Sequence, residues 1–146
     1  MNARVAIDNA GMDTRAAWPA PLTLVLVDSE LDRAWQSGDE ACLELASAQV
    51  LWPGSTQRQP QQGWVWPLRL RWSGVQGWQA QGLLQGRIAG ARLLLDGRPL
   101  QPALPAGHEG RLRLELELAR GGGVSLEART LRITLEGAQL RESLAC

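Results

Sequence analysis

The chain has 146 residues, which is most simply one domain, long enough to bury a sizeable hydrophobic core. Its 15 basic and 15 acidic residues balance, so no strong net field favours nucleic acid or an anionic membrane as a partner. Every basic residue apart from the one histidine is arginine, and tryptophan, present seven times, stands alone among the large aromatic residues. Several tryptophans must therefore fill core volume.

The chain contains no run that approaches the roughly 18 apolar residues of a membrane-spanning helix. Asp8 and Asp13 interrupt the stretch where a secretory signal would be apolar. Cys42 and Cys146 are too few to indicate a disulfide-framed secreted domain, and whether they pair is left open. We expect a soluble, cytoplasmic protein without a transmembrane segment, with peripheral membrane association left open.

Residues 1–20 are mixed in character and predict a partly irregular N-terminal arm ahead of a single β-rich domain over 21–146. Leu22–Val27 predicts a strand that is apolar on both faces from Leu24 onward, which is typical of a central strand.

The segment from Asp28 to Gln36 carries the clearest helix signal in the chain. Ser29 can cap a first turn, with Asp32 three residues later, in a weaker form of the capping box. Leu31, Ala34 and Trp35 then share one face at helical spacing. The pattern predicts one short helix over about 29–37, packed onto the sheet by Trp35.

A stripe of large apolar residues follows the polar loop at 53–63. Alternation in this segment puts five side chains on one face of a strand: Trp64, Trp66, Leu68, Leu70 and Trp72. Pro67 cannot donate a ladder hydrogen bond, which favours an edge strand or a bulged one.

The most regular pattern lies near the C-terminus. Arg111–Leu118 alternates charge and leucine, Gly121–Gly123 can reverse the chain, and Val124–Leu135 alternates again. The second run changes phase near Arg129 and Thr130, which predicts a β-bulge there. This is a long antiparallel hairpin with one face in water.

Together these elements predict a mainly β fold: an antiparallel curved sheet or a β-sandwich of about seven to nine strands, with one short helix.

The search for catalytic chemistry returns mostly exclusions. His108, the single histidine, falls in a predicted turn at 107–110 and has no second histidine or cysteine near it at metal-ligand spacing. Ser29, Ser73 and Ser125 lack the context of a nucleophile elbow. We expect no catalytic residue, no metal and no cofactor, and therefore no enzyme.

The tryptophan stripe is the best candidate for a binding surface. Its residues, together with Trp35, could contact a lipid-like or other apolar ligand or a partner strand, although the simpler interpretation, which we favour for the stripe, is that they fill the core. We retain as candidate ligand or partner residues the set Trp64, Trp66, Leu68, Leu70, Trp72 and Trp35.

Leu22-Thr-Leu-Val-Leu-Val-Asp-Ser-Glu-Leu-Asp-Arg-Ala-Trp35 runs from an apolar strand into the predicted helix, and Leu93–Leu100 and Gly110–Leu114 form later hairpins. These features resemble the cyanobacterial LmeA-like phospholipid-binding family over residues 22–35 and 88–135. The resemblance implies that a β-rich cradle binds an amphiphile without catalysis, and it transfers no functional residue. The family has a further β-rich portion before this helix, nearly absent here, so a shortened relative could pair two copies to complete a sheet.

Our leading functional hypothesis is a non-enzymatic binding module, a β-rich cradle for a lipid-like or other apolar ligand. The alternative is a protein-interaction module that forms a homodimer, or pairs with a partner, through an edge strand around 64–72.

Overall fold

The computed structural model describes residues 4–6, 22–53, 61–104, 106–134 and 139–142. These residues form one antiparallel sheet with no helix, which confirms the mainly β prediction. None of them forms a helix of the length and hydrophobicity needed to cross a bilayer. The strands are β1 (Arg4–Ala6), β2 (Leu22–Ser37), β3 (Glu40–Trp52), β4 (Gln61–Trp66), β5 (Leu68–Ser73), β6 (Gln76–Gln81), β7 (Gly86–Leu95), β8 (Arg98–Pro99), β9 (Ala103–Leu104), β10 (Ala106–Leu118), β11 (Gly123–Thr134) and β12 (Gln139–Glu142).

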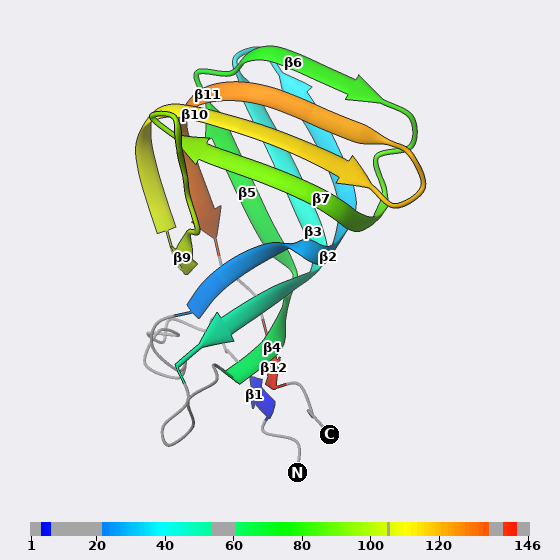
Figure 1. The fold of residues 1–146 in the computed structure, drawn as a ribbon, viewed down its shortest axis with the longest axis vertical. Coiled ribbons are helices and arrows are strands. Elements are labelled where there is room, and N and C mark those ends of the chain that lie inside the picture. Colours follow the sequence, from blue (N-terminus) through cyan, green and yellow to red (C-terminus); the bar gives the residue numbers. More distant parts are fainter. Residues whose placement is uncertain (1–3, 7–21, 54–60, 105, 135–138, 143–146) are drawn as a thin grey trace.

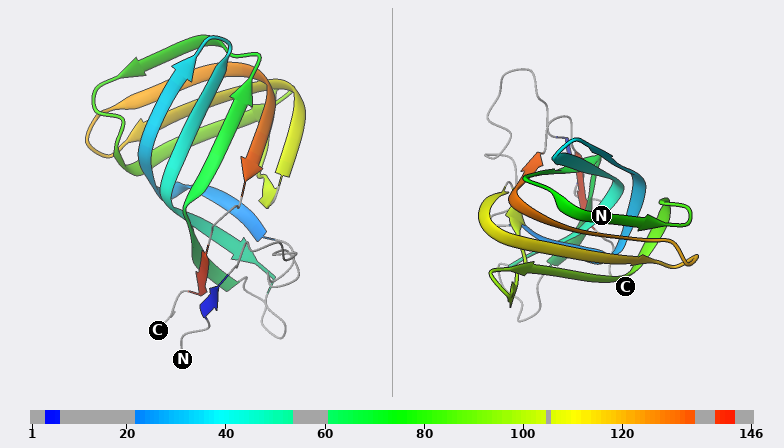
Figure 2. Two further views of the ribbon diagram at one scale, coloured as in Figure 1. Left: turned by 180° about the vertical axis from the view of Figure 1, so that it is seen from behind. Right: turned by 90° about the horizontal axis from the view of Figure 1, so that it is seen from above.

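Six of these strands close into a barrel. The order β3-β5-β11-β10-β7-β2 returns to its start because β2 also pairs with β3 (Figure 1). The second half of β3 leaves the barrel and continues the sheet through β4, β12 and β1, which lie below it in Figure 1. From behind, β2, β3 and β5 run side by side along one wall (Figure 2). The closed barrel replaces the open curved sheet or sandwich that we expected.

The barrel interior is a leucine-rich core. Alternate residues on each strand point inward, and most of them are less than 5% exposed. Leu43 and Leu45 on β3 and Leu112 and Leu114 on β10 have no exposed surface. Trp72 on β5 is the largest fully buried side chain, at 1% exposed. The interior is therefore filled by side chains, as expected for a small barrel.

The predicted C-terminal hairpin is confirmed as β10 and β11. Leu112, Leu114 and Leu116 lie opposite Ala128, Leu126 and Val124 on the inner face. The register shifts between Glu109 and Leu112, where two residues on β10 face Arg129 on β11. This is the predicted bulge, with the extra residue on β10, and it lets both halves of β11 face one core.

The predicted helix over 29–37 is wrong, because the whole segment belongs to β2. Its pairing with β3 shifts register repeatedly between Val25 and Arg33. These bulges place Leu31 and Ala34 on the same inner side three residues apart, so a bulged strand imitates helical spacing. Trp35 then points outward and is 39% exposed.

Ser29 does not cap a helix, and instead stabilises the bulge. Its Oγ donates a hydrogen bond to the carbonyl oxygen of Val25 (2.7 Å) and accepts one from the backbone N–H of Gln49 (2.9 Å). Asp28 beside it has a φ of 73°, a left-handed conformation that a helix start cannot contain. The serine hydroxyl satisfies backbone groups where β2 bends into the barrel (Figure 1).

The predicted tryptophan stripe is split between two faces. Val65 is the fully buried side chain of β4, and its neighbours Trp64 and Trp66 lie half-buried on the opposite face. The chain then passes through the cis bond between Trp66 and Pro67 into β5, where Leu68, Leu70 and Trp72 face the core.

The expected edge strand at 64–72 is also wrong. β4 lies between β3 and β12, and β5 lies between β3 and β11. Pro67 sits between the two strands, at the point where the chain leaves one and enters the other, so its missing N–H interrupts neither ladder.

Candidate functional site

A groove of about 760 Å³ lies on the outside of the barrel wall, across β2, β3, β5, β11 and β10. Most of its lining residues occupy outward-facing positions of these strands, and buried residues between them, such as Ala41, Trp72 and Leu131, line it as well. None of the strands that build it is covered by a helix in the part of the chain that the structure describes.

One cross-strand row forms the floor of this groove. The registers place Trp35 opposite Cys42, Cys42 opposite Arg71, Arg71 opposite Arg132 and Arg132 opposite Gly107. Residues directly opposite one another in a ladder project their side chains to the same face. We call these five residues the floor row, and all five line the groove.

Trp35 closes one end of the floor row. It is one of two large hydrophobic side chains that the described residues leave exposed, the other being Leu83 at 64%. The guanidinium carbon of Arg33 lies 4.7 Å from the centre of the indole ring, a cation–π contact. The opposite end is Gly107, where an added Cβ would meet no atom within 4 Å. The floor row thus runs from an aromatic face to open space.

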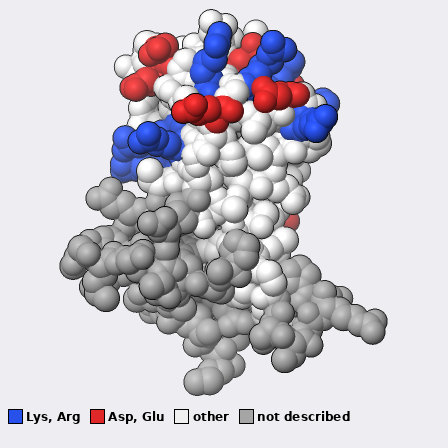
Figure 3. Space-filling view, turned by 90° about the vertical axis from the view of Figure 1, so that its left-hand side faces the viewer, with Lys and Arg blue, Asp and Glu red and all other residues white. Residues whose placement is uncertain are grey.

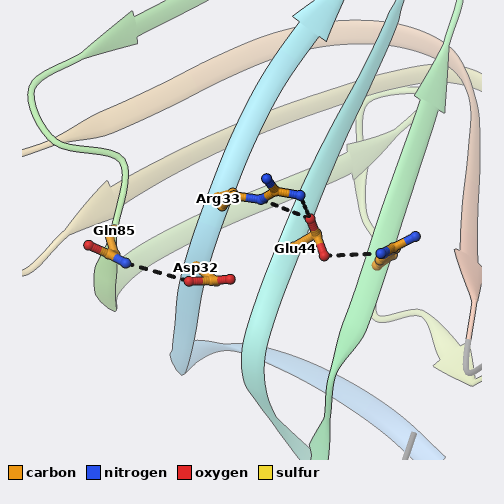
Figure 4. Close-up of polar contacts among 5 residues, drawn as sticks. Asp32, Arg33, Glu44 and Gln85 are labelled. Atoms are coloured by element: carbon orange, nitrogen blue, oxygen red, sulfur yellow. Dashed lines mark hydrogen bonds and ion pairs between the residues drawn. The ribbon is translucent and has the colours of Figure 1, made fainter. Parts of the chain in front are cut away.

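Beside the floor row, a second row links three strands by charge. Glu44 on β3 accepts hydrogen bonds from Arg33 on β2 (2.6 and 3.0 Å) and from Arg69 on β5 (3.2 Å) (Figure 4). The hydrogen bond from Arg33, followed by the charges of both arginines, lowers the pKa of Glu44, although partial burial opposes this. Glu44 is thus held as a carboxylate, and both of its oxygens are engaged.

Cys42 lies in the middle of the floor row and is almost completely covered, at 8% exposed. Burial raises the pKa of its thiol, and the charge of Glu44 adds to this, while the neighbouring arginines act in the opposite direction. Cys42 therefore stays a neutral thiol, a weakly polar part of the floor. Its pairing with Cys146 lies outside the described residues.

His108 lies in β10 and not in the predicted turn. It is opposite Leu131, which is opposite Trp72, so the imidazole shares the inner face with two core residues. His108 Nε2 and Trp72 Nε1 are buried and lack a hydrogen-bond partner among the described residues. His108, Leu131 and Trp72 are also among the residues that line the groove. No group of three or more potential metal ligands occurs in the described part of the chain.

Of the six residues that the sequence nominated, two line this groove, Trp35 and Trp72. Trp35 does so because β2 is a strand and not a helix. Trp72 also lines the groove, although only 1% of its surface is exposed, and Leu68 and Leu70 are core. Trp64 and Trp66 lie on β4, outside the groove.

Sequence reasoning missed the arginines of the groove. Arg69 and Arg71 alternate with the leucines of β5, a pattern that shows an outward face, but their neighbours on β3 and β11 are known only once the sheet order is known.

No known protein family, curated protein or solved structure matches this chain. The likeness to the LmeA-like family therefore stays a prediction, and the helix start that it implied at Asp28 is strand here.

Proposed function

We propose that this chain is a non-enzymatic binding module whose outer groove takes a lipid-like or other apolar ligand against Trp35. The exposure of Trp35 carries the proposal. The fold buries Trp72 almost completely, yet it leaves the indole of Trp35 39% exposed at the end of a concave surface. A ligand that covers this ring removes apolar surface from water, which stabilises the complex by about 25 cal/mol per Å².

The packing of the barrel supports an outer site over an inner one. The cradle that the sequence suggested would enclose its ligand, but the inward-facing positions are occupied by close-packed leucines such as Leu43, Leu70 and Leu114, each with no exposed surface. A lipid-like molecule inside the barrel would have to displace several of them. The outer groove needs no such rearrangement.

The test is native mass spectrometry of the purified protein, with organic extraction of any molecule it carries, followed by titration with 1-octanol. We expect wild-type protein to bind an apolar molecule and Trp35→Ala to lose at least about tenfold in affinity, since about 2 kcal/mol of burial is removed. Leu83→Ala is the matched control, because it removes the other exposed large hydrophobic side chain, outside the groove. Binding that is absent in wild type, or equal in Trp35→Ala, contradicts the proposal.

A second candidate is the protein-interaction module, now with a different edge. Among the described strands β6 pairs only with β11, so one side of its backbone is unpaired. β6 carries no charged residue (Gln-Gly-Trp-Gln-Ala-Gln), and charge is a common device that keeps edges from pairing. The same native mass spectra decide this point: a dimer that survives at micromolar concentration favours strand addition at β6, and a monomer at all concentrations contradicts it.

A further inference from the structure

Two arginines in the floor of the groove face one another without a counter-charge. Arg71 on β5 lies directly opposite Arg132 on β11, and both side chains are exposed. Like charges directly opposite one another destabilise a sheet. Neither forms an ion pair with any residue that the structure describes.

The nearby carboxylates do not neutralise this pair. Glu44 and Glu40 are equally close to Arg71 in register, and both oxygens of Glu44 are already held by Arg33 and Arg69. Glu40 and Glu109 line the groove in the row on the other side, opposite Ser73 and Thr130, and make no ion pair with Arg71 or Arg132. The charge of the two guanidinium groups is thus left for solvent or for a ligand.

We infer that Arg71 and Arg132 together bind an oxyanion, a phosphate or a carboxylate, which forms the polar end of the ligand in the groove. This inference rests on the proposed function and extends it from an apolar ligand to an anionic amphiphile. Guanidinium groups match the oxygens of phosphate and carboxylate, because they donate parallel hydrogen bonds in a fixed plane.

The floor row gives such a ligand a direction. The anion lies over Arg71 and Arg132, and the apolar part extends past the neutral Cys42 thiol onto the face of Trp35. Gly107, next to Arg132, leaves the other side of the anion open. The hydroxyl groups of Ser73 and Thr130, hydrogen-bonded to each other, border the anion from the adjacent row.

Some other arginines of the barrel have a carboxylate partner. On the face shown in Figure 3, basic and acidic side chains are mixed over the upper part of the molecule, and uncharged residues lie below them. Arg113, for example, pairs with Glu115 (3.2 Å), and Arg87 pairs with Asp28 (3.0 Å). Arg71 and Arg132 differ because these two cations are adjacent and neither has an ion-pair partner among the described residues.

The experiment compares n-octyl phosphate, 1-octanol and inorganic phosphate by isothermal titration calorimetry on the full chain. The two alkyl probes share one tail and differ only in the oxyanion. We expect octyl phosphate to bind more tightly than either other probe, and its affinity to fall as salt is raised. Arg71→Gln and Arg132→Gln should each weaken octyl phosphate by about tenfold or more and leave 1-octanol unchanged.

Two further variants serve as controls. Arg120→Gln makes the same charge change in the exposed β10–β11 turn, outside the groove, and should bind octyl phosphate as wild type does. Gly107→Asp places a carboxylate opposite Arg132, where its backbone needs no positive φ, and should compete with the ligand and weaken octyl phosphate alone. Thermal melting of each variant checks that it is folded.

The outcomes separate the two proposals. Equal binding of octyl phosphate and 1-octanol, unchanged in Arg71→Gln and Arg132→Gln, overturns the oxyanion inference and leaves the apolar groove standing. Inorganic phosphate that binds as tightly as octyl phosphate, and is lost in both arginine variants, supports the oxyanion site and overturns the lipid-like ligand. Failure of all three probes to bind overturns both.

Discussion

At the scale of the residue, the arginines on this face of the barrel differ in whether they form an ion pair with a carboxylate. Glu44, at 13% side-chain exposure, engages two guanidinium groups from the strands on either side. That pairing engages one of the two carboxylates, Glu44 and Glu40, that lie diagonally across the β3–β5 ladder from Arg71. Arginines on one face therefore differ in their contacts: Arg33 and Arg69 tie strands together through Glu44, and Arg71 and Arg132 form no ion pair with the residues that the structure describes.

The pairing of Glu44 predicts a dependence of stability on pH. Because its pKa in the folded protein lies below the ordinary value of 4.5, its carboxylate stabilises the fold above that pH, and this contribution is lost as pH falls through the lowered pKa. Glu44→Gln should lower the free energy of unfolding by about 1 kcal/mol at pH 7, with the difference from wild type shrinking below pH 4.5.

Urea unfolding at a series of pH values measures this difference. Glu127→Gln, which removes an exposed carboxylate without an ion pair among the described residues, controls for the change in net charge. If wild type and Glu44→Gln lose stability in parallel down to pH 3, the ion pairs of Glu44 with Arg33 and Arg69 contribute nothing to the stability of the fold.

At the scale of the element, the bulged strand β2 decides where the groove lies. Its irregular pairing with β3 between Val25 and Arg33 turns the strand into the barrel and brings Trp35 to the outer face. A helix at the same place would have packed Trp35 onto the sheet, as we predicted. The bulge is held by the two hydrogen bonds of Ser29, a residue with no exposed surface.

Replacing this serine should therefore destabilise the whole protein. Ser29→Ala leaves the N–H of Gln49 and the carbonyl of Val25 without their partner in a buried position, at a cost of about 1–3 kcal/mol. Ser125→Ala, in half-buried β11 surroundings, is the matched control and should change stability by less than about 0.5 kcal/mol. Equal midpoints for the two variants in urea would refute the role given to Ser29.

At the scale of the whole molecule, the barrel is closed unevenly. β10 and β11 share ten residue pairs, but β2 and β7 share only two, Glu30 with Arg87 and Leu31 with Gly86. Exposed contacts supplement this seam: Arg87 pairs with Asp28, and Gln85 donates a hydrogen bond to Asp32 (3.5 Å) (Figure 4). Such contacts add little, because solvent competes for them.

The β2–β7 seam should be the first part of the barrel to open. Amides of Glu30, Leu31 and Arg87 are expected to exchange with deuterium faster than those of Leu114 and Leu126 in the β10–β11 ladder. Hydrogen exchange followed by NMR measures each amide separately. Protection at the seam equal to that of the ladder would mean that the barrel opens only by global unfolding.

Local pattern in the sequence was enough to predict strands, turns and the faces of the C-terminal hairpin. Leu112, Leu114 and Leu116 lie inward because a period of two has a direct physical meaning in a strand, and the phase change near Arg129 predicted a real bulge. The same local reasoning failed at 29–37, where bulges in β2 reproduce helical spacing, and at Pro67, which separates two strands and does not mark an edge.

The closed barrel and the groove were decided only by the tertiary structure. Arg71 and Arg132 are 61 positions apart, and nothing in either local pattern says that β5 pairs with β11. A strand's sequence shows which side chains share a face, but the pairing partner depends on the packing of the whole core. Burial of the leucines and Trp72 selects the strand order, and that order places Trp35, Cys42, Arg71 and Arg132 in one cross-strand row.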